Sequence, residues 1–165
     1  MIKDQAATSL AGHYITFKLG DELFAINVFQ VREILDLMPI TKVPTAPEHL
    51  RGVVNVRGKA IPVVDLRRRF GLPPVADTVH TRIVVLELEL DGAPCTVGGQ
   101  ADSVHNVIEL DATQIEPPPS LASRWRAELV RGMARRGEDF IMILDVDRIF
   151  SMEDLTAPSV PDVAA

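Results

Sequence analysis

The chain has 165 residues, 47% of them hydrophobic and 24% charged, which is enough to bury the core of an ordinary globular protein. Its formal net charge of −6 argues against a general binding surface for nucleic acid or anionic lipid, because both favour net positive charge. The sequence has a single cysteine, no apolar run of membrane-spanning length and no apolar secretion signal at its N-terminus, which fits a cytoplasmic protein.

Alternating apolar residues predict two strands near the start of the chain. Residues 1–12 are expected to form a flexible tail, followed by strands over His13–Leu19 and Leu23–Ile26. Asn27 is a suitable N-cap for a helix from Val28 to Met38, whose apolar residues would form one stripe. Several prolines then predict an extended connection to the next strand.

One unit of the sequence occurs twice, 80 residues apart. Its copies are LRGVVNVRGKAIPVVDLRRRF, Leu50–Phe70, and VRGMARRGEDFIMILDVDRIF, Val130–Phe150. Each copy predicts a strand, a glycine-containing turn such as Gly58-Lys59, a second strand and a short helix. Asp65 and Asp145 follow the second strands and are expected to cap these helices. Pro62 cannot donate to a ladder, so its strand is expected at a sheet edge or with a bulge.

Similar signals continue in the second half. The predicted elements are three strands and one short helix, Arg82–Leu90, Ala93–Val97, Val104–Leu110 and Leu121–Leu129. Asp91-Gly92 is a strong hairpin signal between the first two strands, and the helix would carry the only tryptophan, Trp125. Residues 156–165 offer little to bury and are expected to form a flexible tail.

This pattern of short strands with little helix favours a mainly β fold. We expect two small barrels side by side, rather than a parallel α/β sheet, with a single antiparallel sandwich as the structural alternative. Because the repeated unit recurs, one barrel is assigned to residues 13–74 and the other to 81–150, and residues 13–70 and 81–150 are expected to superpose. The folded domain as a whole is assigned to residues 13–155.

A search for reactive groups predicts no catalytic residue, cofactor or metal. Cys95 has no basic neighbour that would activate a thiol and is interpreted as a structural cysteine. Asp102 and His105 would point to opposite faces of a strand, and no second ligand pair completes a metal site. Gly98-Gly99 lacks the remainder of a dinucleotide-binding motif. Arg67-Arg68-Arg69 is interpreted as a solvated helix face rather than a phosphate site.

Two surface residues are candidates for protein binding. Arg57 lies at the tip of the first predicted hairpin, where a guanidinium could bind a partner's carboxylate through two hydrogen bonds. The alternative is an ordinary solvated arginine at a turn. Phe29 falls on the polar side of the predicted helix, where it either packs under a loop or anchors an interface.

The linked motifs resemble the CheW family of bacterial chemotaxis coupling proteins. They are GDELFAINVFQVREIL, APEHLRGVVNVRGKAIPVVDLRRRF, DSVHNVIEL, IEPPP and FIMILDVDRIF, and they span about residues 13–155. The resemblance implies two SH3-like five-stranded β-barrels around a shared core, and a non-enzymatic adaptor between chemoreceptor tips and the regulatory domain of the histidine kinase CheA. The protein would then be recruited to membrane-associated receptor arrays. Val31, Glu33, Gly52 and Arg57 match family positions tied to receptor or kinase contact.

The chain departs from the family pattern at Gly98-Gly99-Gln100, which replaces part of a continuous apolar strand and is expected to weaken it. Three alternatives remain at this stage. A coupling module of a non-motility pathway, or one from a longer chemotaxis protein, would share the same motifs. A small hydrolase that uses Cys95 belongs to a different class, which thiol alkylation would distinguish from an adaptor.

Overall fold

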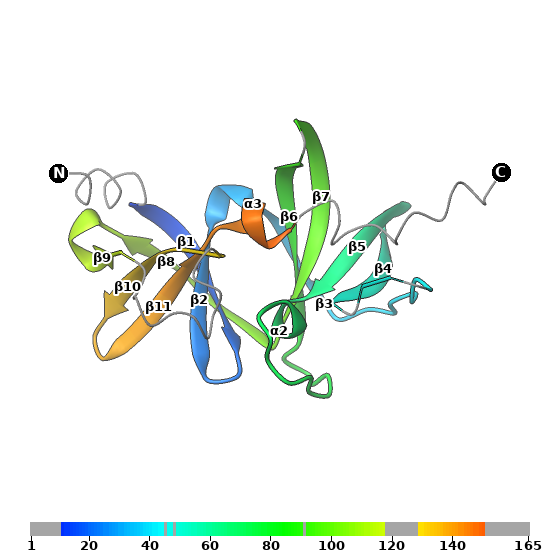
Figure 1. Ribbon diagram of the computed structural model, residues 1–165, viewed down its shortest axis with the longest axis horizontal. Coiled ribbons are helices and arrows are strands. Elements are labelled where there is room, and N and C mark those ends of the chain that lie inside the picture. Colours follow the sequence, from blue (N-terminus) through cyan, green and yellow to red (C-terminus); the bar gives the residue numbers. More distant parts are fainter. Residues whose placement is uncertain (1–10, 45, 48, 91, 118–128, 151–165) are drawn as a thin grey trace.

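A computed structural model describes residues 11–44, 46–47, 49–90, 92–117 and 129–150 (Figure 1). The predicted helix around Trp125 lies outside these residues except for Leu129, as do the predicted tails apart from residues 11 and 12. Gly12 already belongs to the first strand, because it pairs with Leu110.

The described residues form short strands with a few single-turn helices. The strands are β1 (Gly12–Leu19), β2 (Glu22–Asn27), β3 (Val31–Asp36), β4 (Leu50–Val56), β5 (Lys59–Asp65), β6 (Arg82–Leu90), β7 (Ala93–Ala101), β8 (Ser103–Leu110), β9 (Ile115–Glu116), β10 (Val130–Arg136) and β11 (Asp139–Leu144). The helical elements are η1 (Val28–Gln30), α2 (Leu66–Arg69), η2 (Ala112–Gln114) and α3 (Val146–Ile149). The expected mainly β fold is therefore confirmed.

The strands form two sheets that stand side by side (Figure 1). Sheet A has the order β8-β1-β2-β11-β10-β9, and sheet B has the order β3-β6-β7-β5-β4. In each sheet a hairpin, β10–β11 or β4–β5, pairs in parallel with a strand of a second hairpin, β1–β2 or β6–β7. Sheet A has a sixth strand beyond the expected five because the two-residue β9 adds to β10.

Both sheets take strands from both halves of the chain, which differs from the expected division into residues 13–74 and 81–150. Sheet A combines β1 and β2 with β8 to β11, whereas sheet B holds β3 to β7. The cause is that two connections between the sheets are too short to let the chain turn back into the sheet it has just left. The chain passes from β2 through η1 directly into β3, and from β7 to β8 across Asp102 alone, so each half exchanges its first hairpin with the other.

The helix predicted over Val28–Met38 is wrong. Only the turn η1 forms, with Asn27 Oδ1 accepting from the backbone N–H of Phe29 at 2.9 Å, and Val31–Asp36 continues as β3. Burial alternates along β3, as in a strand with one inward face. Pairing with β6 satisfies the backbone, and this tertiary partner overrides the helical spacing of the apolar residues.

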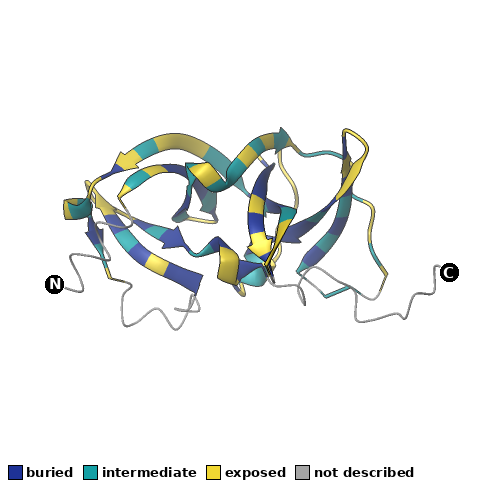
Figure 2. Cartoon of the chain, turned by 90° about the horizontal axis from the view of Figure 1, so that it is seen from above, coloured by how far each residue is buried: buried dark blue, intermediate teal, exposed yellow. Residues whose placement is uncertain are grey.

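The described residues form three apolar clusters, and Figure 2 shows the buried residues that follow the strands of both sheets. One cluster lies within each sheet: that of sheet A includes Tyr14 and Ile143, and that of sheet B includes Val63 and Ile83. The third and largest joins the two sheets. Each sheet thus encloses its own core, and the hairpins exchanged between the halves are held by a shared one.

The two copies of the repeated unit form the same local structure. Each has a hairpin with a register shift, before Gly52 in β4 and before Gly132 in β10, followed by a one-turn helix. Asp65 caps its helix, since Oδ1 accepts from the N–H of Arg67 at 3.0 Å. Asp145 occupies the same position without a side-chain cap bond and instead pairs with Arg148 at 3.4 Å.

The expected edge position of Pro62 is wrong, because β5 lies inside sheet B between β4 and β7. The proline is tolerated since the pairing with β7 begins only at Val63. The departure at Gly98-Gly99 does not interrupt the strand, because β7 continues through both residues to Ala101. A Cβ on Gly98 would lie 2.8 Å from Ile83 Cγ2, so close packing requires a glycine there.

Of the three α2 arginines that were expected to form a solvated face, Arg68 is exposed, but Arg67 and Arg69 are partly buried. The Arg67 side chain is 11% exposed, and its Nη1 lies 2.6 Å from Asp102 Oδ2, which also accepts from the N–H of Gly20 at 2.7 Å. Arg69 Nε donates to the backbone oxygen of Ile149 at 2.8 Å. These contacts join the two sheets at the crossing between β7 and β8 and join α2 to α3.

Candidate protein-binding surface

The candidate residues Glu33 and Arg57 form a bidentate ion pair between β3 and the tip of the β4–β5 hairpin. Arg57 Nη1 donates to Glu33 Oε1 at 3.3 Å, and Nη2 pairs with Oε2. Arg57 and Gly58 occupy the two turn positions with φ of 51° and 85°, rather than the expected pair Gly58-Lys59. The turn is fixed by Asn55, whose side-chain oxygen accepts from the N–H of Gly58 at 2.9 Å.

This ion pair sets the protonation of both groups. The hydrogen bond from Arg57 lowers the pKa of the Glu33 carboxyl below its usual value, and the hydrogen bond to Glu33 raises the pKa of Arg57. Both groups are therefore charged over the physiological range. The Arg57 side chain is 69% exposed against 24% for Glu33, so the guanidinium is the more accessible of the two to a partner.

Phe29 and Val31 have different environments although only Gln30 lies between them. Phe29 is 90% exposed on η1, so it does not pack under a loop. An aromatic ring with this exposure is suited to bury apolar surface against a partner. Val31 is half-buried at the start of β3 and packs against the shared core, so only part of its side chain is accessible.

Gly52 is buried and does not itself present a surface. Its φ is 150°, and a Cβ at this position would overlap the backbone oxygen of Thr41 and lie 2.8 Å from Ile40 Cγ2. Thr41 pairs with Val53 through two backbone hydrogen bonds of 2.8 Å. A glycine is required because this segment crosses directly over β4.

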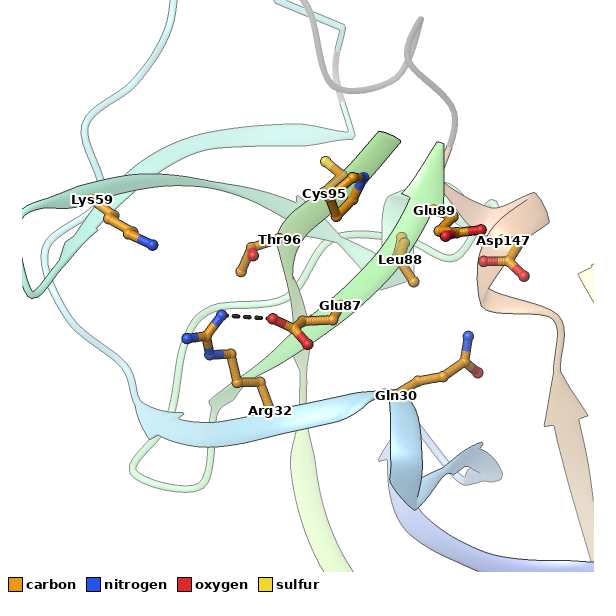
Figure 3. Close-up of a pocket in the computed structure, with 10 residues that line it drawn as sticks. Gln30, Arg32, Lys59, Glu87, Leu88, Glu89, Cys95, Thr96 and Asp147 are labelled. Carbon is orange, nitrogen blue, oxygen red and sulfur yellow. Dashed lines mark hydrogen bonds and ion pairs between the residues drawn. The ribbon is translucent and has the colours of Figure 1, made fainter. Parts of the chain in front are cut away.

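A pocket of about 610 Å³ lies next to the ion pair, where η1, β6, β7 and α3 meet (Figure 3). Arg32 from β3 and Glu87 from β6 pair across it at 2.6 Å, while Glu89 and Asp147 stand together at its other end (Figure 3). Burial and the negative charges of Asp145 and Glu89 raise the pKa of Asp147. Sequence reasoning missed this pocket, because its charged residues come from four elements whose register was unknown.

The described residues offer little for catalysis. Cys95 is half-buried at the pocket wall, and burial raises the pKa of its thiol, which disfavours the nucleophilic thiolate. The His105 side chain hydrogen-bonds Ser103 at 2.9 Å, whereas the Asp102 side chain binds Arg67, so the two side chains have different partners. Within the described ranges no three His, Cys, Asp or Glu side chains gather as metal ligands. No helix there has the length and hydropathy needed to cross a membrane.

Comparisons with known proteins point to one family. A family model described as the CheW-like domain matches residues 13–154. The chain is 29% identical over 150 residues to the chemotaxis protein CheW of Klebsiella aerogenes, covering 91% of this chain and 88% of that protein. It is 32% identical over 143 residues to the chemotaxis protein CheW of Rhizobium meliloti, covering 87% and 90%. The crystal structure of the scaffolding protein TtCheW from Thermoanaerobacter tengcongensis superposes with a TM-score of 0.76 at 33% identity, covering 88% of this chain and 91% of that one.

Proposed function

The chain belongs to the CheW-like domain family, and we propose that it is a non-enzymatic adaptor that couples chemoreceptors to the histidine kinase CheA in bacterial chemotaxis-type signalling. The observation that carries this proposal is the extent of the family match, because residues 13–154 include every described strand of both sheets except the first residue of β1. The similarity to a scaffolding protein over 88% of the chain supports it further.

The shape of the protein suits this role. An adaptor must hold two partners at once, and two barrels with separate cores offer surfaces at different positions. The raised thiol pKa of Cys95 argues against the alternative of a small cysteine hydrolase. A coupling module of a non-motility pathway would use the same surfaces, so the distinction lies in the partner and not in this chain.

We assign partner contact to the exposed residues of the candidate surface. The Arg57 guanidinium and the Phe29 ring are accessible, and Glu33 orients Arg57 through their ion pair. Val31 lies on β3, the strand that carries Glu33, and the accessible part of its side chain also contacts the partner. Gly52 acts indirectly, by allowing residues 40–42 to pack over β4 beside the hairpin. The partners are the kinase regulatory domain and the receptor cytoplasmic tips, and the protein is recruited to membrane-associated receptor arrays.

A reconstitution experiment tests the proposal. Purified chain is mixed with CheA and receptors in lipid vesicles, and kinase autophosphorylation is measured with and without the chain. We expect receptors to change kinase activity only when the chain is present, and the ternary complex to sediment faster than either binary complex. Strict competition between kinase and receptor for one site would contradict the adaptor role. Asp21→Ala, an exposed change at the β1–β2 turn, is the matched control for Arg57→Ala.

A further inference from the structure

The registers of the two sheets establish which residues occupy equivalent places. In sheet B, Val63 pairs with Gly98, Gly98 with Val85 and Val85 with Glu33. The residue 80 positions after Val63 is Ile143. In sheet A, Ile143 pairs with Ala25 and Ala25 with Thr16, and Thr16 Oγ1 donates to the backbone oxygen of Asn106 at 3.1 Å. Asn106 on β8 therefore stands where Glu33 stands on β3.

A pocket in sheet A is the counterpart of the pocket that holds the Glu33–Arg57 pair. The sheet B pocket is lined by Arg32, Glu33, Val56, Arg57, Lys59, Ile61, Val85 and Thr96. In the same order, the equivalent residues of sheet A are His105, Asn106, Arg136, Gly137, Asp139, Ile141, Thr16 and Leu23, and all of them line one pocket together with Lys18 and Ile108. The two barrels thus carry the same pocket twice.

The sheet A pocket lacks the ion pair that covers its counterpart. Asn106 replaces Glu33, and Gly137 replaces Arg57, so neither the carboxylate nor the guanidinium is present at the rim. The volume is correspondingly larger, about 430 Å³ against about 150 Å³. An open polar cavity therefore stands in one barrel at the place that an intramolecular salt bridge fills in the other.

Positive groups line this open pocket. Arg136 takes the place of Val56, so a guanidinium occupies a position that is buried and apolar in the other barrel. Among the described residues the Arg136 side chain has no hydrogen-bond or ion-pair partner, whereas the side chain of the adjacent Arg135 pairs with Glu116 at 3.5 Å. Lys18 adds a second cation, and Asp139 is the one carboxylate of the lining, without an ion pair to either cation.

We propose that this pocket binds an acidic side chain of a protein partner, whose carboxylate pairs with Arg136 and so supplies the group that Glu33 supplies in the other barrel. A guanidinium and a carboxylate form paired, planar hydrogen bonds, which explains why an arginine whose side chain has no partner among the described residues selects this ligand. The inference concerns the opposite barrel from the proposed receptor and kinase surface and does not depend on that assignment.

Features beside the pocket favour a protein over a free carboxylate. Among the described residues, strand β8 is an edge of sheet A and pairs with β1 alone, so its outer backbone groups have no ladder partner there and suit an extended segment. Leu23 on β2 and Ile108 on β8 are partly buried and line the pocket, so apolar side chains adjoin the charged site. A polypeptide can contact these groups and the guanidinium together, whereas a small anion cannot.

The test follows the Nε–Hε NMR signal of Arg136 in the full chain during titration with a peptide, acetyl-Gly-Glu-Val-Gly-amide, and with its Gln counterpart. We expect the Glu peptide to shift this signal saturably and the Gln peptide to leave it unchanged. The Thr16 and Asn106 amides report binding to variants. Arg136→Gln should weaken binding at least about threefold, the lower range for an exposed charged hydrogen bond, and Arg135→Gln, on the opposite face, should not.

A further variant supplies the missing carboxylate in the chain itself. Asn106→Glu should pair with Arg136 and block the Glu peptide while the protein remains folded. Equal binding of the Glu and Gln peptides, or unchanged affinity in Arg136→Gln, would overturn the proposal. Saturation by acetate at the same concentration as the peptide would also overturn it, because the site would then hold free anions and not a protein segment. None of these readouts uses kinase or receptor, so failure here and failure of the adaptor role are distinguishable.

Discussion

Substituting Gly52 by alanine tests whether the close crossing of residues 40–42 over β4 explains the glycine. The new Cβ would overlap the Thr41 backbone oxygen, and backbone cannot move aside as a flexible side chain can. The segment must leave, which breaks the two 2.8 Å hydrogen bonds between Thr41 and Val53. Each bond contributes about 0.5–1.5 kcal/mol, so this loss is about 1–3 kcal/mol. The positive φ adds about 1–3 kcal/mol of backbone strain.

Gly12→Ala is the matched control, because Gly12 has a φ of 154° against 150° for Gly52 and nothing within 4 Å of its Cβ position. It should show the backbone strain without the overlap. The difference between the two variants therefore isolates the crossing, and about 2 kcal/mol of difference corresponds to a melting temperature lower by about 4–8 °C in a chain of this size.

Calorimetry and urea unfolding of both variants measure the difference, and hydrogen exchange locates it. In Gly52→Ala the amides of Thr41 and Val53 should lose protection, while amides of sheet A should keep theirs. An equal loss of stability in both variants would refute the reasoning, because backbone strain alone would then account for the glycine. Loss of partner binding in Gly52→Ala without lost protection at Thr41 would mean that Gly52 contacts the partner directly.

The remaining predictions concern charged groups. Arg57→Ala and Glu33→Ala should keep a melting temperature near that of the unchanged protein, yet weaken receptor or kinase binding severalfold by calorimetry. Arg57→Lys should restore only part of the affinity, and unchanged affinity in the alanine variants would exclude the assignment. Because Arg57 lowers the pKa of Glu33, the stabilisation from this ion pair is present above the ordinary carboxyl pKa and is lost as the pH falls through the pKa of Glu33 in the folded protein. Carboxyl NMR should therefore show a higher Glu33 pKa in Arg57→Ala, and an unchanged pKa would contradict this. Asp102→Asn removes the negative charge that Arg67 and the Gly20 amide bind, and it should lower the free energy of unfolding in urea by about 1.5–3 kcal/mol. An unchanged free energy of unfolding would show that the sheet junction does not depend on this charge.

Several features could be predicted because they depend on neighbours in the chain. The repeated unit gave two hairpins with one-turn helices, and the alternation in Arg82–Leu90 gave β6 with its bounds. Asp65 was recognisable as a cap from its position alone. The family motifs, spread over most of the chain, likewise identified the class of protein before any contact was known.

Only the tertiary structure decided which strands pair. The spacing of apolar residues in Val28–Met38 satisfies a helix, and β6 makes it a strand by supplying the hydrogen bonds of its backbone. The repeat suggested one barrel for each half of the chain. The connections through η1 and Asp102 are too short for the chain to fold back into the same sheet. Each half therefore places its first hairpin in the sheet that holds the repeated hairpin of the other half. The pairing of Glu33 with Arg57, and the open counterpart at Asn106 and Arg136, follow from those registers, which no local pattern in the sequence encodes.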